Sequence, residues 1–148
     1  MSFLDLFDSR DKKKRLSHIR NLIMLALSDG TFDKSEMELI TKIGISAGLT
    51  PNELERIFAR PDSIDFYPPE TYRERIEQLY DMVLVMMVNT EIHENEILIC
   101  KLIAEKLGFK HTIIDKMVRD TIDMIINGIA FDIDLTTIAL TACSVSDD

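Results

Sequence analysis

Residues 28–58 decide the fold, and they read SDGTFDKSEMELITKIGISAGLTPNELERIF. Asp33 with Glu36 three residues later is a variant of the capping box that begins a helix, and Gly48 is the residue type at which helices commonly end. Thr50, followed at once by a proline, caps a second helix in a similar way. The stretch therefore predicts an acidic turn, a helix, a glycine turn and a further short helix.

The flanking sequence contains the same kinds of helix start and stop signals. Apolar residues spaced three and four apart predict a first helix, with a cap at Asp8 and an end near Gly30. The chain contains only five Gly and four Pro, which are few turn residues for an all-β protein. We therefore expect an all-α, single-domain bundle of about seven helices. The later helices are expected to start at Pro69 or Glu70 and to cover about 94–107, 112–127 and, as a short docked helix, 134–142, with 144–148 loose.

A shift of 60 residues aligns the chain with itself without a gap from Arg15 to Phe58. The matched positions share apolar character, helix caps and helix stops rather than identity. We expect two pseudo-repeated three-helix units that pack face to face, because one unit alone would leave an apolar face open. The units cover about 10–60 and 72–120, with a linker over 60–71 and a C-terminal segment over 121–148. The matched pairs include Leu16/Ile76, Glu36/Glu96, Ile43/Ile103 and Gly48/Gly108.

The chain of 148 residues is 46% hydrophobic and 29% charged, and its net charge is −9. This is the composition of an ordinary globular domain, and the acidic excess argues against a general nucleic-acid binder. Cys100 and Cys143 form no disulfide framework, which favours a reducing compartment. No apolar run is long enough to span a membrane, and no signal peptide is visible. We therefore expect a cytoplasmic protein.

The acidic turn is the part of the sequence that most suggests a binding site. Asp29, Asp33 and Glu36 offer hard oxygen ligands, which with water and a backbone carbonyl near Thr31 would hold Ca²⁺, Mg²⁺ or Mn²⁺ weakly. The turn is not an EF-hand, because counting back from Gly30 places leucines where the first two carboxylate ligands belong. The alternative is that Asp-Gly makes the turn while Asp33 and Glu36 only cap the helix.

A longer pattern runs over residues 27–58: a small residue before Asp-Gly, an apolar position, a Glu, and a Gly-Leu-Thr restart before another Glu. It resembles the TerB-like family, which includes the tellurite-resistance protein TerB and the N-terminal domain of the co-chaperone DjlA. The resemblance, which the repeat extends to about residue 118, implies an all-helical, internally repeated fold, linked to stress responses and to divalent metal through acidic turns. It does not imply an enzyme. The residues that carry it are Ser28-Asp29-Gly30, Phe32-Asp33, Glu36, Ile40, Ile43, Ala47-Gly48-Leu49-Thr50 and Glu53.

The second copy departs from this pattern, since Asn89-Thr90 replaces Asp-Gly and His93 replaces an acid. A metal role for that turn is therefore in doubt. His93 with its acidic neighbours would make a mixed metal site, or it caps the helix or faces solvent. The basic run from Arg10 to Arg15 would touch an anionic partner, a membrane surface or RNA, or it is a solvated helix start. The acidic neighbours of His93 are Glu91, Glu94 and Glu96.

No catalytic constellation is visible, and His18 and His111 have no patterned partners. We therefore expect a non-enzymatic module with a protein-interaction or stress-response role. The alternative is a protein that binds or senses a divalent cation or a tellurite-type oxyanion through the acidic turn. The expected partner is a protein of unspecified identity, and a homodimer is also open. Nucleic acid, a membrane span and any cofactor other than the weakly bound cation are not expected.

Overall fold

The computed structural model describes residues 3–30, 33–88 and 92–127, and in this part of the chain all regular structure is helical. The all-α expectation is confirmed. Six α-helices and two short 3-10 turns are described. The helix expected over 134–142 lies outside the described residues, so the count of about seven stays a prediction. The elements are α1 (Phe3–Ala26), η1 (Leu27–Asp29), α2 (Lys34–Ser46), α3 (Pro51–Ala59), η2 (Pro61–Ser63), α4 (Tyr72–Met87), α5 (Glu94–Lys106) and α6 (His111–Asn127).

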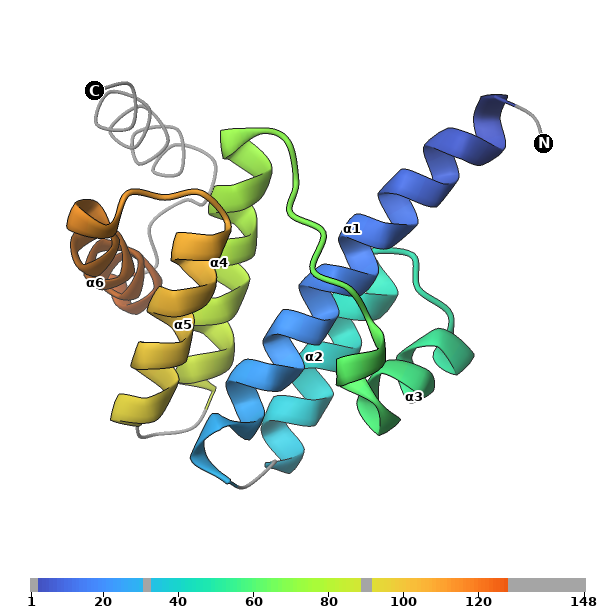
Figure 1. Ribbon diagram of the computed structural model, residues 1–148. Helices are drawn as coiled ribbons and strands as arrows, with labels where there is room; N and C mark the ends of the chain where they lie inside the picture. The colour runs from blue at the N-terminus through green and yellow to red at the C-terminus, as the bar shows by residue number, and fades with distance from the viewer. Residues whose placement is uncertain (1–2, 31–32, 89–91, 128–148) are drawn as a thin grey trace.

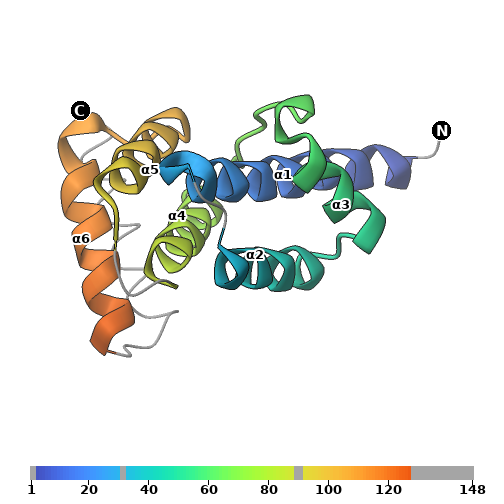
Figure 2. The same cartoon turned by 90° about the horizontal axis from the view of Figure 1, so that it is seen from below.

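The long helix α1 is the axis on which the others are arranged. It contacts α2, α3, α4 and α5, while α4, α5 and α6 contact one another. Figure 1 shows α2 and α3 on one side of α1 and the three later helices on the other, and Figure 2 shows these three helices grouped at one end of α1. The core forms where α1 meets α4, since Leu22 and Ile23 of α1 and Leu79, Met82 and Val83 of α4 are all buried.

The helix boundaries follow local capping signals. The Thr50 hydroxyl accepts a hydrogen bond from the Glu53 N–H at 3.2 Å, and Pro51 is the first residue of α3, as expected. Helices α2 and α5 are both followed by a glycine with positive φ, at Gly48 (+89°) and Gly108 (+108°). Both helices therefore end where the sequence predicted a glycine stop, because an L side chain is strained in this backbone conformation.

Two predicted helix starts are wrong. Helix α1 begins at Phe3 rather than after a cap at Asp8, because no proline or glycine lies between residue 3 and the end of the helix. Helix α4 begins at Tyr72 rather than at Pro69 or Glu70. Its cap is Thr71, whose hydroxyl accepts from the Glu74 N–H at 3.2 Å.

Candidate functional site

The acidic turn is described in part. Asp33 is the exposed N-cap of α2, and its N–H donates to Glu36 Oε1 at 3.4 Å within the expected capping box. The side chains of Asp29 and Thr31 lie outside the described residues, as does Glu91 of the second turn, while His93 is the exposed N-cap of α5. Among the described residues, no group of three or more His, Cys, Asp or Glu side chains is placed to hold a metal ion. The site of Asp29, Asp33 and Glu36 therefore stays a prediction.

Glu36 and Glu96 share an unusual position. Both lie in the first turn of their helices, α2 and α5, and both are 0% exposed. The partial positive charge of a helix N-terminus stabilises a carboxylate there, and buried carboxylates persist in proteins only when such interactions offset the loss of water. Glu36 and Glu96 are thus buried parts of the two turns rather than exposed ligands.

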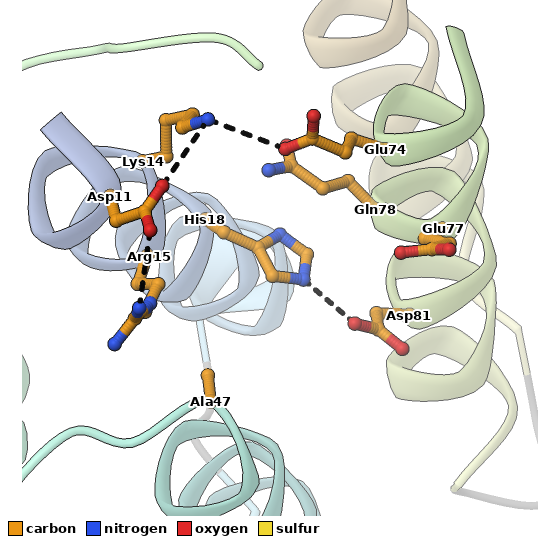
Figure 3. A pocket seen from close by; sticks show the side chains of 9 residues that line it. All are labelled: Asp11, Lys14, Arg15, His18, Ala47, Glu74, Glu77, Gln78 and Asp81. Atoms are coloured by element: carbon orange, nitrogen blue, oxygen red, sulfur yellow. Dashed lines mark hydrogen bonds and ion pairs between the residues drawn. The ribbon is translucent and has the colours of Figure 1, made fainter. Parts of the chain in front are cut away.

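A polar cleft opens between α1 and α4, with α2 at its lower edge (Figure 3). Its volume is about 240 Å³. Figure 3 shows the imidazole of His18 pointing from α1 across the cleft toward α4, where its Nε2 lies 2.8 Å from Asp81 Oδ2. The cleft is lined by Asp11, Lys14, Arg15, His18, Ala47, Glu74, Glu77, Gln78 and Asp81.

The charges in this cleft are largely paired with one another. Lys14 bridges the two helices, since its Nζ lies 3.5 Å from carboxylate oxygens of both Asp11 and Glu74, and Arg15 lies 3.6 Å from Asp11. Burial of Lys14 by itself lowers the pKa of its ammonium, but the carboxylates of Glu74 and Asp11 outweigh this effect and raise it. These pairs join α1 to α4.

His18 is the residue that sequence reasoning missed. It is 8% exposed, and its Nδ1 is buried without a hydrogen-bond partner among the described residues. Its partner Asp81 lies 63 residues away on another helix, so no local sequence pattern predicts the pair. No Ser, Thr, Cys or Tyr is part of the described lining of this cleft, so His18 has no side-chain hydroxyl or thiol there to activate.

A second, apolar groove lies between α1 and α5, beside the linker residue Phe66. Its volume is about 170 Å³. Met24 of α1 and Leu102 of α5 line it and are 42% and 47% exposed. Leu27 in η1 and Leu98 in α5 are 43% and 57% exposed, and each lies one helical turn along the chain from a lining residue, Leu27 from Met24 and Leu98 from Leu102. We call Met24, Leu27, Leu98 and Leu102, with this groove, the α1–α5 surface; the groove itself is lined by Arg20, Asn21, Met24, Phe66, Ile99, Leu102, Ile103 and Lys106.

Other candidates from the sequence have structural roles. Cys100 is buried, and burial raises the pKa of its thiol to about 12, which makes it unreactive. Lys12 in the basic run pairs with Glu53 of α3 at 2.6 Å. The basic run therefore serves in part to tie α1 to the following helices.

Comparison of the chain with protein-family models, curated proteins and solved structures finds no match. Within residues 3–30, 33–88 and 92–127, no helix combines the length and the apolar character needed to cross a membrane.

Proposed function

We propose that the chain is a non-enzymatic, TerB-like helical module that binds a partner protein through the α1–α5 surface. The observation that carries this proposal is the exposure, by more than two fifths, of Met24 and Leu102, which line an apolar groove. Leu27 and Leu98, one turn along the chain from them, are exposed to a similar degree. Contiguous exposed apolar patches on soluble proteins commonly mark interaction sites. Such patches bind because contact with a partner removes their apolar area from water.

Exposed apolar residues elsewhere in the described part of the chain make weaker candidates. Met37 and Ile45 lie eight residues apart on α2, and Ile126 lies near the end of α6. None of the three lines a described hollow. Scattered single apolar residues are normal on protein surfaces, whereas at the α1–α5 surface two elements contribute to one groove.

The proposal includes the two-unit organisation, α1–α3 and α4–α6. It is supported by paired details 60 residues apart. A Cβ built at Gly48 would lie 3.1 Å from Arg15 Nη1, and one built at Gly108 would lie 2.6 Å from Arg75 Nη1. An arginine at the equivalent position therefore lies against the equivalent glycine turn in each unit. The buried Glu36 and Glu96 form a further pair of equivalent residues. The TerB-like assignment depends on this organisation and on the acidic turn.

Cation or oxyanion binding by the acidic turn is the alternative function. The exposed carboxylate of Asp33 supports it, whereas the complete burial of Glu36 opposes it, because a buried ligand would have to leave its helix start to meet a hydrated ion. Titration with Ca²⁺ and Mn²⁺ tests this, with Asp29→Asn and Asp33→Asn as variants. Amide shifts of the turn at millimolar cation that vanish in both variants would establish the alternative.

The test of the leading proposal compares matched surface variants in protein capture from native lysate. Leu98→Ser with Leu102→Ser removes two side chains of the α1–α5 surface, and Met37→Ser with Ile45→Ser removes two similarly exposed ones from α2. We expect a partner that the wild type and the α2 variant retain and the α5 variant loses. Equal retention by all three proteins, or loss only in the α2 variant, would refute the assignment of this surface.

A further inference from the structure

The α1–α5 surface is suited to binding a helix. Leu98 and Leu102 lie one turn apart on α5, and Met24 and Leu27 lie one turn apart where α1 passes into η1. One member of each pair, Met24 and Leu102, lines the groove, and α5 contacts both α1 and η1. Amphipathic helices bind such grooves with apolar side chains spaced three and four residues apart.

The groove also carries two cations that form no ion pair with the residues that the structure describes. Arg20 and Lys106 line it, and neither forms an ion pair within the described residues, although acidic residues outnumber basic ones by 26 to 17. The buried Nε of Arg20 has no hydrogen-bond partner there either. By contrast, Lys101 of the same helix α5 pairs with Asp115 at 2.7 Å. The guanidinium of Arg20 is therefore without a compensating carboxylate within the described residues.

The acidic residues next in sequence to the groove do not neutralise these cations. Asp65 lines a separate hollow with Lys13, and Glu105 lies 3.7 Å from His111. Within the described residues, the lining of the groove is thus apolar apart from Arg20, Asn21 and Lys106, and it contains no acidic side chain. A carboxylate from a bound partner would complement its positive charge.

This charge pattern disfavours a second copy of the chain as the occupant. A two-fold dimer pairs the same surface of both subunits. It would place Arg20 and Lys106 of both copies in one interface, where the described groove lining contains no carboxylate to pair with them. Like charges facing each other across an interface oppose association.

We infer that the α1–α5 surface binds an acidic amphipathic helix of another protein. Apolar side chains one turn apart on that helix enter the groove, and its carboxylates reach Arg20 and Lys106. The inference rests on the proposed function and adds to it the chemical class of the partner.

A charge-swap experiment on the full chain tests this inference. The probes are two synthetic helical peptides of about 18 residues, long enough to form isolated helices. Both carry leucines three and four residues apart, one with Glu and the other with Lys at the flanking positions. By fluorescence anisotropy, the Glu peptide should bind wild type at least about tenfold more tightly than the Lys peptide. Arg20→Glu with Lys106→Glu should reverse this preference, and Lys42→Glu, an exposed cation of α2, should leave it unchanged.

The outcomes separate the inference from the proposed function. Equal binding of both peptides, abolished by Leu98→Ser with Leu102→Ser, would overturn the acidic partner and leave the apolar surface as the binding site. Failure of both peptides to bind would also overturn the inference, while lysate capture would still decide the proposed function. Association of the protein with itself in sedimentation, lost in the leucine variant, would make a second copy the occupant. Melting midpoints check that each variant is folded.

Discussion

Replacement of Gly44 by alanine probes the packing of α2 against α3. Gly44 is buried inside α2, and a Cβ added there would overlap Leu54 Cδ2 and lie 3.3 Å from Leu54 Cδ1. Alanine is favoured over glycine inside a helix by about 1 kcal/mol. An extra methyl group in a tight core costs about 1–3 kcal/mol. Since the overlap is with a buried side chain, we expect Gly44→Ala to lower the free energy of unfolding by up to about 2 kcal/mol rather than raise it.

A double-mutant cycle isolates the contact. Leu54 is 4% exposed, so Leu54→Ala alone should cost about 2–5 kcal/mol. In the double variant the new methyl group has room, so the overlap disappears and the helix-propensity gain remains. The losses in the free energy of unfolding of the two single variants, added together, should therefore exceed the loss in the double variant by about 1–3 kcal/mol.

Urea unfolding followed by circular dichroism measures each free energy. Ile114→Ala combined with Gly44→Ala is the matched control, because Ile114 is equally buried and lies in α6, which does not contact α2. That pair should be additive within about 0.5 kcal/mol. Additivity of Gly44 and Leu54 to the same degree, or a stabilised Gly44→Ala, would refute the packing described for α2 and α3.

Three further measurements follow from single side chains. Asp33→Ala should lower the free energy of unfolding by about 0.5–2 kcal/mol through loss of a helix cap, and an unchanged midpoint in urea would contradict the cap. The hydrogen bond from Lys12, aided by the Thr50 N–H, lowers the pKa of Glu53 below its ordinary 4.5. The charge of Glu53 therefore stabilises the fold above pH 4.5, and the excess stability of wild type over Glu53→Gln should shrink as acid titration proceeds below it. Cys100 should resist iodoacetamide at pH 8 until urea unfolds the chain, because it is buried with a pKa of about 12; mass spectrometry showing rapid labelling of the native protein would place it at the surface.

Local chemistry explains which parts of the fold were predictable. Thr50 with the proline after it, Asp33 with Glu36, and the glycine at 48 each determine a boundary through groups a few residues apart. The wrong start of α4 has the same origin. Proline at the first helical position and threonine at the cap are both valid start signals, and the hydrogen bond between Thr71 and Glu74 selects the second.

The candidate site depends on long-range packing and was not predictable in this way. Helix α5 is apolar around most of its circumference, from Ile97 to Ile103. Periodicity therefore cannot tell the covered Ile103 from the exposed Leu98 and Leu102. Which face stays open is decided by where α1 and α4 lie. The pairing of His18 with Asp81 likewise exists only after α1 and α4 have come together.

An acidic chain and an acidic partner are compatible because charge acts over two ranges at this surface. The net charge of −9 repels such a partner at long distance. In 0.15 M salt, however, the Debye length is about 8 Å, so most of that repulsion is screened before contact. Arg20 and Lys106 act at about 3 Å, in the lining of a groove from which an apolar partner expels water, where screening is weak. The overall charge thus governs how fast partners approach at low salt. Arg20 and Lys106, which form no ion pair within the described residues, govern which partner stays bound.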